Sequence, residues 1–247
     1  AAEGEATSGM AAEAARAALA DAGLHPGDID AIIVATSTPD LTFPSVATMV
    51  QERLGMTTGF AYDVQAVCAG FVFALANANG MILSGQAERV LVIGAETFSR
   101  ILDWTDRGTC VLFGDGAGAL VLEATTGDGL PGDRGILAVD LHSDGRYRDI
   151  LYVDGGVATT GTAGVLKMQG KEVFRQAVEK LAETAHTALA KAGLEAQDVD
   201  WIVPHQANLR IIKATAQRMG LPMEKVVVTV QDHGNTSAAS IPLALSV

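Results

Sequence analysis

The sequence "ALADAGLHPGDIDAIIV" (residues 18–34) recurs as "ALAKAGLEAQDVDWIV" (residues 188–203). The matching positions, such as Gly23 and Gly193, keep a constant offset of 170 residues. In both copies a helical segment ends at an Ala-Gly pair, a short polar turn follows, and a buried strand begins. The recurrence predicts a chain built from two similar halves packed together.

Apolar runs rich in Val and Ile alternate with Ala-rich helical stretches along the whole chain. These runs are "AIIVAT" (31–36), "RVLVIGAE" (89–96), "ALVLEA" (119–124), "WIVP" (201–204) and "KVVVTV" (225–230). Strands that are apolar throughout, set between helices, are typical of largely parallel sheets covered on both faces. The pattern predicts an α/β protein.

The two halves, residues 1–126 and 127–247, differ at their ends. After its cysteine-bearing helix the first half continues with "RVLVIGAETFSR" and "GDGAGALVLEA", whereas the second half stops at "SIPLALSV". The second half has a strand-like lead-in, "RGILAVDLHSDG" (134–145), that the first half does not have. We therefore expect the first half to lack its first strand and the second half its last strands, so that segments are missing at both ends.

Composition excludes several classes of protein. The chain has 247 residues, of which 49% are hydrophobic and 19% charged, which is enough for a large core and unlike a disordered chain. No apolar run approaches the roughly 18 residues of a membrane helix. The acidic start resembles no signal peptide, which favours a cytoplasmic location. A net charge of -12 argues against nucleic-acid binding.

The two cysteines, Cys68 and Cys110, predict neither a disulfide framework nor a zinc site, because no clustered Cys and His residues accompany them. Cys110 lies in the apolar "TCVLF" (109–113) and is expected in the core. Cys68 lies in "AVCAGF" (66–71), where an extended run turns into a helical one. By itself Cys68 could be a buried structural thiol.

Three turns favour chemistry at Cys68: its own, "VPHQANLRII" (203–212) and "HGNTSAAS" (233–240). The repeat aligns "VQAVCAG" (64–70) with "VQDHGNT" (230–236), which predicts that the turns meet where the halves join. A helix N-terminus lowers the pKa of a thiol, and the backbone N–H of Cys68 would face the oxyanion of an attacked acyl group. His205, at a strand end, could exchange a hydrogen bond with a thioester.

In these turns Cys68, His205 and Asn235 resemble the Cys–His–Asn set of the β-ketoacyl-acyl carrier protein synthase III family. "DWTDRGT" (103–109) and "FGDGAGA" (113–119) are similar to that family too, and all five motifs occur in its order. The glycines of "GDGAGA" precede a strand rather than a helix, so we expect them to permit tight packing rather than to hold phosphate. The resemblance implies the thiolase fold, a five-layer αβαβα sandwich of two similar halves.

The resemblance also implies a reaction. Cys68 would take the acyl group from an acyl-CoA, and malonyl-acyl carrier protein would then bind. His205 and Asn235 would hydrogen-bond its thioester carbonyl as CO₂ leaves, and the carbanion would attack the acyl-cysteine to give a 3-oxoacyl-acyl carrier protein. This is the initiation of fatty-acid synthesis, and it requires no cofactor.

Further family positions match residues of this chain. Arg107 corresponds to a CoA-nucleotide contact, and Gly170 and Asn208 to pantetheine contacts. Phe43, in "LTFPS", corresponds to a residue that closes the acyl pocket of the partner subunit, which implies a homodimer. Together with Leu41, Phe71 and Phe73, Phe43 is a candidate to border the acyl pocket.

A presumptive helix over residues 207–219 carries Arg210, Lys213 and Arg218. These residues resemble the family's basic patch for the acidic acyl carrier protein, although a solvated helix face would show the same charges. Besides fatty-acid initiation, the sequence leaves open a polyketide-starter condensing enzyme or acyltransferase of the same family. It also leaves open a non-catalytic thiolase-fold subunit, and an enzyme that joins two CoA esters.

Overall fold

The computed structural model describes residues 1–130 and 132–247, which form two compact units. The first unit contains residues 1–98, 114–126 and 235–247, and the second contains 99–113 and 127–234. The border after Thr126 coincides with the expected boundary between the halves. Because segments 99–113 and 235–247 each group with the other unit, the division into halves at this boundary stays a prediction about the repeat.

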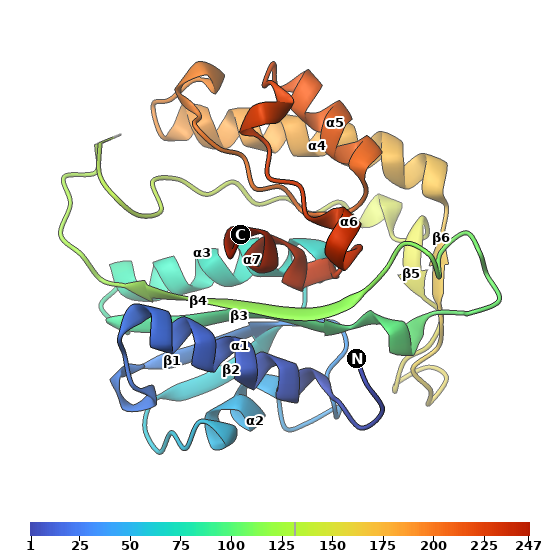
Figure 1. Cartoon of the computed structure of the whole chain (residues 1–247), viewed down its shortest axis with the longest axis horizontal. Coiled ribbons are helices and arrows are strands. Elements are labelled where there is room, and N and C mark those ends of the chain that lie inside the picture. The colour runs from blue at the N-terminus through green and yellow to red at the C-terminus, as the bar shows by residue number, and fades with distance from the viewer. Residues whose placement is uncertain (131) are drawn as a thin grey trace. The chain divides into compact units, whose positions relative to one another are not determined.

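The first unit holds one four-stranded sheet with four α-helices (Figure 1). Its elements are α1 (Thr7–Ala22), β1 (Ala31–Ala35), α2 (Val46–Arg53), β2 (Phe60–Val64), α3 (Gly70–Leu83), β3 (Arg89–Thr97), β4 (Asp115–Glu123) and α7 (Ser240–Leu245). The strand order is β2-β1-β3-β4, with β1 parallel to both neighbours and β4 antiparallel to β3. The expected buried strands at 31–36, 89–96 and 119–124 are therefore confirmed.

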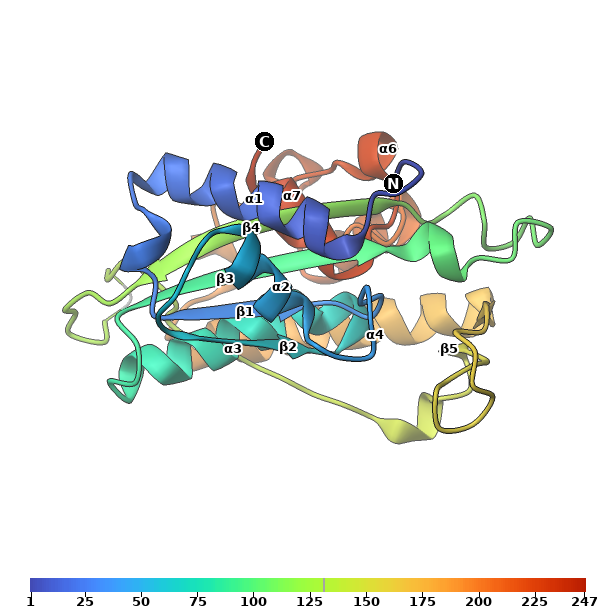
Figure 2. The same ribbon diagram turned by 90° about the horizontal axis from the view of Figure 1, so that it is seen from below.

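Helices cover both faces of this sheet, as Figure 2 shows from below. On one face Ile32 and Val34 of β1 pack with α1 and α2, and on the other Ile33 packs with Phe71 of α3. Successive side chains of a strand point to opposite faces, so a strand buried on both sides must be apolar at every position. This requirement explains the unbroken apolar run at residues 31–35.

Glycines bring α7 and the turn before it close to strands β3 and β4. A Cβ on Gly94 would lie 2.2 Å from the carbonyl oxygen of Ala238, and one on Gly118 would lie 2.8 Å from the backbone nitrogen of Leu243. Gly116 faces Leu243 in the same way, at 2.9 Å from its Cδ1. The expectation that the "GDGAGA" glycines permit tight packing is confirmed.

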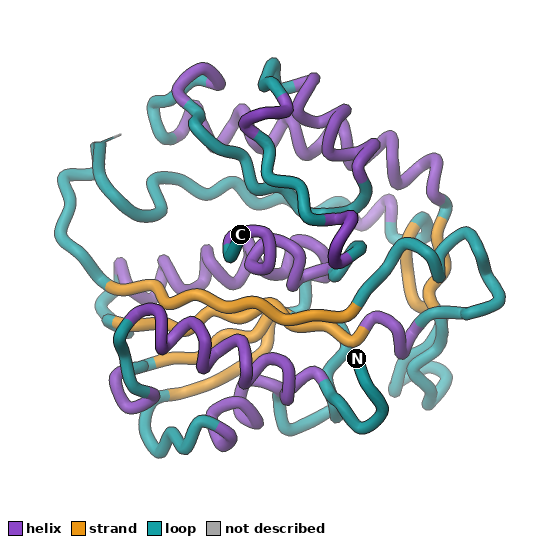
Figure 3. The backbone as a smooth tube through the Cα atoms, viewed as in Figure 1, coloured by secondary structure: helices purple, strands orange, loops and turns teal. Residues whose placement is uncertain are grey.

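The second unit is mainly helical, and Figure 3 shows how little strand it contains. Its elements are β5 (Leu151–Val153), β6 (Leu166–Met168), α4 (Gly170–Lys191), α5 (Leu209–Arg218) and α6 (Val230–His233). Helix α4 packs against α5, and β5 pairs with β6 in an antiparallel hairpin. Ile212 and Ala216 of α5 bury their side chains with Val226. No helix in the described part of the chain has the length and apolar character to cross a membrane.

Three strands expected in the second half do not form as strands. Segments 201–204 and 225–230 share only one parallel bridge, Ile202 with Val226. Pro204 has no N–H to donate, which stops the ladder after a few residues. Segment 134–145 carries no strand among its described residues.

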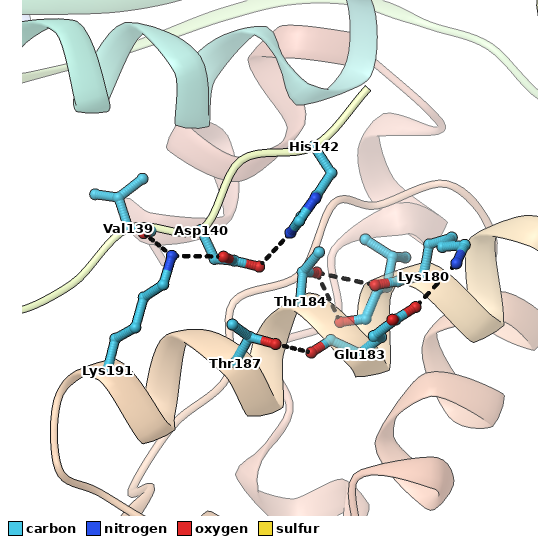
Figure 4. Close-up of polar contacts among 9 residues, drawn as sticks. Val139, Asp140, His142, Lys180, Glu183, Thr184, Thr187 and Lys191 are labelled. Atoms are coloured by element: carbon cyan, nitrogen blue, oxygen red, sulfur yellow. Dashed lines mark hydrogen bonds and ion pairs between the residues drawn. The ribbon is translucent and has the colours of Figure 1, made fainter. Parts of the chain in front are cut away.

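Side chains attach segment 134–145 to the end of α4 instead (Figure 4). Lys191 Nζ donates to Asp140 at 2.7 Å and to the carbonyl oxygen of Val139 at 3.3 Å. His142 Nε2 lies 2.8 Å from the other oxygen of Asp140. The hydrogen bond from Lys191, followed by that from His142, lowers the pKa of the Asp140 carboxyl. The segment is thus held by charged side chains and not by a backbone ladder.

The internal repeat is confirmed in local backbone geometry. Short 3-10 helices at Pro26–Asp28 and Ala196–Asp198 lie 170 residues apart and carry the same capping box. Val67 and Ser237, at the same offset of 170, are the described non-glycine residues with positive φ, 48° and 49°. The expected alignment of "VQAVCAG" with "VQDHGNT" is therefore wrong by four residues, and Cys68 corresponds to Ala238.

Candidate active site

Cys68 lies on a sharp turn between β2 and α3. The turn is the 3-10 helix Val67–Ala69, and α3 begins directly after it at Gly70. The left-handed backbone of Val67 is uncommon for a β-branched residue and marks a strained turn. A Cβ on Gly70 would lie 3.1 Å from the Cβ of Ala35 and 3.4 Å from that of Ala238. The packing of Gly70 therefore fixes Cys68 at the N-terminus of α3.

The surroundings of Cys68 keep its thiol protonated at neutral pH. Burial raises the pKa of Cys68 to about 11, and the negative charge of Glu96 adds to the rise, while a hydrogen bond with Ser237 opposes it. The expected lowering of this pKa is therefore wrong, because desolvation of the thiolate raises the pKa more than the hydrogen bonds of Ser237 and of the Cys68 backbone N–H lower it. Attack by Cys68 consequently requires a group that takes up the thiol proton.

Asn235 lies in the same unit as Cys68, shortly before Ser237. It is buried, its Oδ1 accepts a hydrogen bond from the backbone N–H of Ser237 at 2.9 Å, and its carbonyl oxygen accepts one from Gly114 at 3.0 Å. Neither contact uses the side-chain amide nitrogen. Asn235 thus anchors the turn that contacts Cys68 and keeps an amide donor for another partner.

A buried carboxyl group, Glu96, lies at the centre of this part of the first unit. Its side chain is fully buried on β3, and Oε1 accepts from Ser237 Oγ at 3.0 Å. Oε2 accepts from Thr38 Oγ1 at 2.6 Å and from the Ser37 backbone N–H at 3.0 Å. Neither Glu96 nor Ser237 was predicted from the sequence. The available signal for Glu96 was an acidic residue directly after the apolar run 90–95.

His205 belongs to the second unit, where Gln206 fixes the segment around it. The buried Gln206 side chain donates to the carbonyl oxygens of Pro204 at 2.9 Å and Val227 at 3.1 Å, and accepts from the Thr229 N–H at 2.8 Å. Burial lowers the pKa of His205 to about 4. The imidazole is therefore neutral at pH 7 and has one N–H to donate.

The structure brings Cys68 and Asn235 together within the first unit, since the turn that Asn235 anchors packs against the turn of Cys68. His205 lies in the second unit, which is described by itself. Within the described residues, no group of three or more His, Cys, Asp or Glu side chains is arranged to hold a metal ion.

The residues expected to contact CoA are at or near the surface. Arg107 is exposed in a turn that Asp106 stabilises by accepting from the Gly108 N–H at 2.9 Å. Gly170 is the exposed first residue of α4. Asn208 caps α5, with its Oδ1 accepting from the Ile211 N–H at 2.9 Å. Phe43 is 81% exposed.

Phe71, a candidate to border the acyl pocket, lies fully buried in the core beneath β1 and β3, where the first turn of α3 faces the sheet. The expectation that Cys110 lies in the core needs correction. Cys110 is only half-buried, because it lies in the irregular segment 99–113 and its neighbour Val111 is largely exposed. Leu41 is exposed and Phe73 half-buried.

Arg210, Lys213 and Arg218 are all exposed on α5. The opposite side of the helix buries Ile211, Ile212, Thr215 and Ala216. The helix starts at Leu209 and ends at Arg218, slightly inside the expected range of 207–219. The Arg210 guanidinium lies 5.4 Å from the centre of the Phe174 ring, which orients it toward one side of the patch.

Two family models match the chain. The model described as 3-oxoacyl-[acyl-carrier-protein (ACP)] synthase III matches residues 62–145, and the model of its C-terminal part matches residues 189–247. The β-ketoacyl-[acyl-carrier-protein] synthase III of Rhodobacter capsulatus is 79% identical over 246 residues, covering 100% of this chain and 76% of that protein.

Solved structures are similar as well. The 3-oxoacyl-[acyl-carrier-protein] synthase III of Aquifex aeolicus superposes with a TM-score of 0.90 at 44% identity, covering 98% of this chain and 75% of that one. The β-ketoacyl-[acyl carrier protein] synthase III of Thermus thermophilus does so with a TM-score of 0.89 at 46% identity, covering 100% and 76%. These similarities confirm the expected thiolase-like fold class.

Proposed function

Because the chain belongs to the β-ketoacyl-[acyl-carrier-protein] synthase III family, we propose that Cys68 is its nucleophile and that His205 and Asn235 bind the thioester oxygen of the second substrate. The chain is an acyltransferase of the condensing type. It catalyses the decarboxylating condensation of an acyl-CoA with malonyl-acyl carrier protein, which begins fatty-acid synthesis.

The observation that carries the proposal is the position of Cys68 on a strained turn at the N-terminus of α3. In the first step, the Cys68 sulfur bonds to the thioester carbonyl carbon of the acyl-CoA, the bond from that carbon to the CoA sulfur breaks, and the thiol proton passes to the CoA thiolate. The N-terminal end of the α3 dipole and the backbone N–H of Cys68 favour negative charge beside the sulfur, which would stabilise the tetrahedral intermediate.

In the second step, malonyl-acyl carrier protein loses CO₂, and negative charge moves onto its thioester oxygen. A neutral imidazole at His205 and the amide nitrogen of Asn235 are donors suited to that oxygen. Where such a donor reaches the oxyanion away from water, it lowers the barrier by about 3–4 kcal/mol. The resulting carbanion attacks the acyl group on Cys68 and gives the 3-oxoacyl product.

The substrates imply the partners. CoA contacts would come from Arg107, Gly170 and Asn208, and the basic patch of α5 would receive the acidic carrier protein. The exposed Phe43 would reach across a homodimer interface. Every step uses side chains and substrates only, so the proposed reaction needs no cofactor.

Intact and peptide mass spectrometry, before and after incubation with a panel of acyl-CoAs, tests the nucleophile. We expect one acyl adduct on the tryptic peptide that contains Cys68, and none on the separate peptide that contains Cys110. Cys68→Ala should abolish the adduct and Cys110→Ala should leave it unchanged. An adduct that persists in Cys68→Ala, or a folded wild type that no acyl-CoA labels, would overturn the assignment and favour a non-catalytic subunit.

A further inference from the structure

The buried carboxyl group of Glu96 is held in one orientation by the donors on its Oε2 side. Oε2 accepts from Thr38 Oγ1 at 2.6 Å and from the Ser37 backbone N–H at 3.0 Å. A longer contact of 3.4 Å joins it to Thr36 Oγ1. The Thr38 hydroxyl oxygen accepts from the Thr97 backbone N–H at 2.8 Å, so its own proton points to Glu96. Because these donors keep Oε2 in place, Oε1 also keeps a single direction.

The other carboxyl oxygen, Oε1, holds Ser237. The Ser237 hydroxyl donates to Oε1 at 3.0 Å, and its backbone N–H donates to Asn235 Oδ1 at 2.9 Å. Ser237 has a left-handed backbone with φ of 49°, which costs energy for a residue other than glycine and persists only when its surroundings hold it. Ser237 therefore links the carboxyl group of Glu96 to the side chain of Asn235.

The direction of the Asn235 amide nitrogen depends on this link. The Asn235 backbone carbonyl oxygen accepts from the Gly114 N–H at 3.0 Å, which holds the main chain. The side-chain amide is planar, so a hydrogen bond to Oδ1 also sets the position of Nδ2. The described hydrogen bonds of the Asn235 side chain include this one bond, from the Ser237 N–H. All these residues belong to the first unit.

We propose that Glu96, acting through Ser237, is a positioning residue that sets the direction of the Asn235 amide nitrogen. Glu96 stands on β3, a strand buried between helices, and so provides a rigid reference point. Burying a carboxyl group is costly, and this role gives a reason to retain it. For catalysis the inference rests on the proposed function, in which this nitrogen donates to the thioester oxygen. Such a donor must stay within about 0.5 Å of its productive position.

Two substitutions separate the link from the charge. In Glu96→Gln the amide oxygen must take the Oε2 position, because the Ser37 backbone N–H can only donate. The NH₂ group of the glutamine then faces Ser237 Oγ, which can accept, so the link is kept without the charge. Ser237→Ala removes the link to Glu96 but keeps the backbone N–H that donates to Asn235.

Nitrogen-15 NMR relaxation of the Asn235 side-chain amide, recorded without substrate, tests the inference. The signal is assigned by its absence from Asn235→Asp. In the wild type we expect an order parameter of about 0.85, as in rigid backbone, and a fall below about 0.6 in Ser237→Ala. Glu96→Gln should keep the wild-type order. Full order in folded Ser237→Ala, or lost order in Glu96→Gln, would overturn the inference.

Thr236→Val is the matched control. Thr236 lies between Asn235 and Ser237, and its Oγ1 is buried with no hydrogen-bond partner among the described residues. The substitution therefore removes a buried hydroxyl without breaking a hydrogen bond, and the Asn235 amide should stay as ordered as in the wild type. Equal loss of order in Thr236→Val and Ser237→Ala would mean that any change in this turn disturbs Asn235, which contradicts a specific role of Glu96.

Ser237→Gly separates positioning from the relief of strain. Glycine adopts a positive φ at no steric cost, so this variant keeps the turn even where Ser237→Ala does not fold. If the bond to Glu96 positions Asn235, the order of the amide should remain low in Ser237→Gly. If the bond only supports a strained backbone, glycine should restore the order, and the inference would be wrong.

The catalytic consequence is measured separately, as decarboxylation of malonyl-acyl carrier protein relative to single-turnover acylation by acyl-CoA. In Ser237→Ala decarboxylation should fall about tenfold more than acylation, because a displaced donor no longer meets the thioester oxygen. In Thr236→Val the ratio of the two rates should match that of the wild type. If the amide loses its order while this ratio stays unchanged, the donor role of Asn235 in the proposed function fails, and the positioning by Glu96 stands.

Discussion

The amide oxygen and the amide nitrogen of Asn235 have different proposed roles, and substitution can separate these roles. Its oxygen anchors Ser237, and its amide nitrogen is the proposed donor to the thioester oxygen. We expect Asn235→Asp, which keeps an oxygen acceptor but removes the amide donor, to retain Cys68 acylation within about threefold. Decarboxylation of malonyl-acyl carrier protein should fall by about 100-fold, as for other lost oxyanion donors.

Asn235→Ala removes the anchor as well as the donor and serves as the comparison for Asn235→Asp. It should lower acylation too, because the Ser237 turn beside Cys68 loses one of its two hydrogen bonds. The measurements are single-turnover acylation by mass spectrometry and release of labelled CO₂. Equal loss of both steps in Asn235→Asp would contradict the roles assigned here.

The partly buried imidazole of His205 makes stability depend on pH. Its pKa falls from 6.5 to about 4 in the folded protein, so the unfolded chain binds more protons between these values. Stability is therefore fully present above about pH 6.5 and is lost as the pH falls toward 4. Between pH 7 and pH 5 we expect His205 to account for about 2 kcal/mol of lost unfolding free energy, measured by urea denaturation.

His205→Gln is the matched variant, since glutamine keeps a donor but does not titrate in this range. The wild type should lose more stability than His205→Gln over the same pH interval, and the difference isolates the one group. If both proteins lose the same amount, His205 is not held neutral by burial.

At the scale of single elements, β4 and α7 depend on the absence of side chains at their contact. Gly118→Ala would place a Cβ 2.8 Å from the Leu243 nitrogen and 2.8 Å from the Pro242 carbonyl carbon, both backbone atoms that cannot turn away. We expect a loss of about 1–3 kcal/mol of unfolding free energy. Gly80→Ala, on α3 with open space around its Cβ position, should stabilise by about 0.5–1 kcal/mol. Urea denaturation measures the unfolding free energy of both variants. If both substitutions changed it in the same direction, the packing explanation would be excluded.

The same elements show what the sequence could and could not predict. Strand β1 and the burial of both its faces could be predicted, because a strand that is buried on both sides must be apolar at every position. The prediction of strands in the second half was wrong. The segments "WIVP" and "KVVVTV" have strand propensity, but propensity does not specify the neighbouring strand with which a segment must pair. The expected lowering of the Cys68 pKa was wrong for a related reason. A helix N-terminus is visible in the sequence, but the burial of the sulfur and the nearby Glu96 charge come from segments distant in the chain.

At the scale of the whole molecule, the repeat was predictable and its details at the site were not. Gly23 and Gly193 end matching helices with φ of 67° and 70°. Because this left-handed conformation favours glycine, both copies of the repeat carry a glycine there. Val67 and Ser237 share an equally unusual conformation, but neither is a glycine, so no residue type marks the match. The alignment of segment 64–70 with segment 230–236 therefore followed similar residue types, and it differs by four residues from the alignment that the backbone geometry supports.

Net charge makes the α5 patch the decisive region for an acidic partner. The chain carries -12 overall, so its net charge repels an acidic carrier protein, and the exposed Arg210, Lys213 and Arg218 of α5 are the proposed site of attraction. Lys213→Glu should raise the KM for malonyl-acyl carrier protein about three- to tenfold while acylation by acyl-CoA stays unchanged. Lys180→Glu, which makes the same charge change at an exposed position on α4, should have a much smaller effect on this KM.

Steady-state kinetics at low salt and at about 0.5 M salt measures the KM of both variants. The effect of Lys213→Glu should shrink at the higher salt concentration, because exposed charges are then screened. Equal effects of the two variants would mean that total charge, and not the patch, governs the encounter.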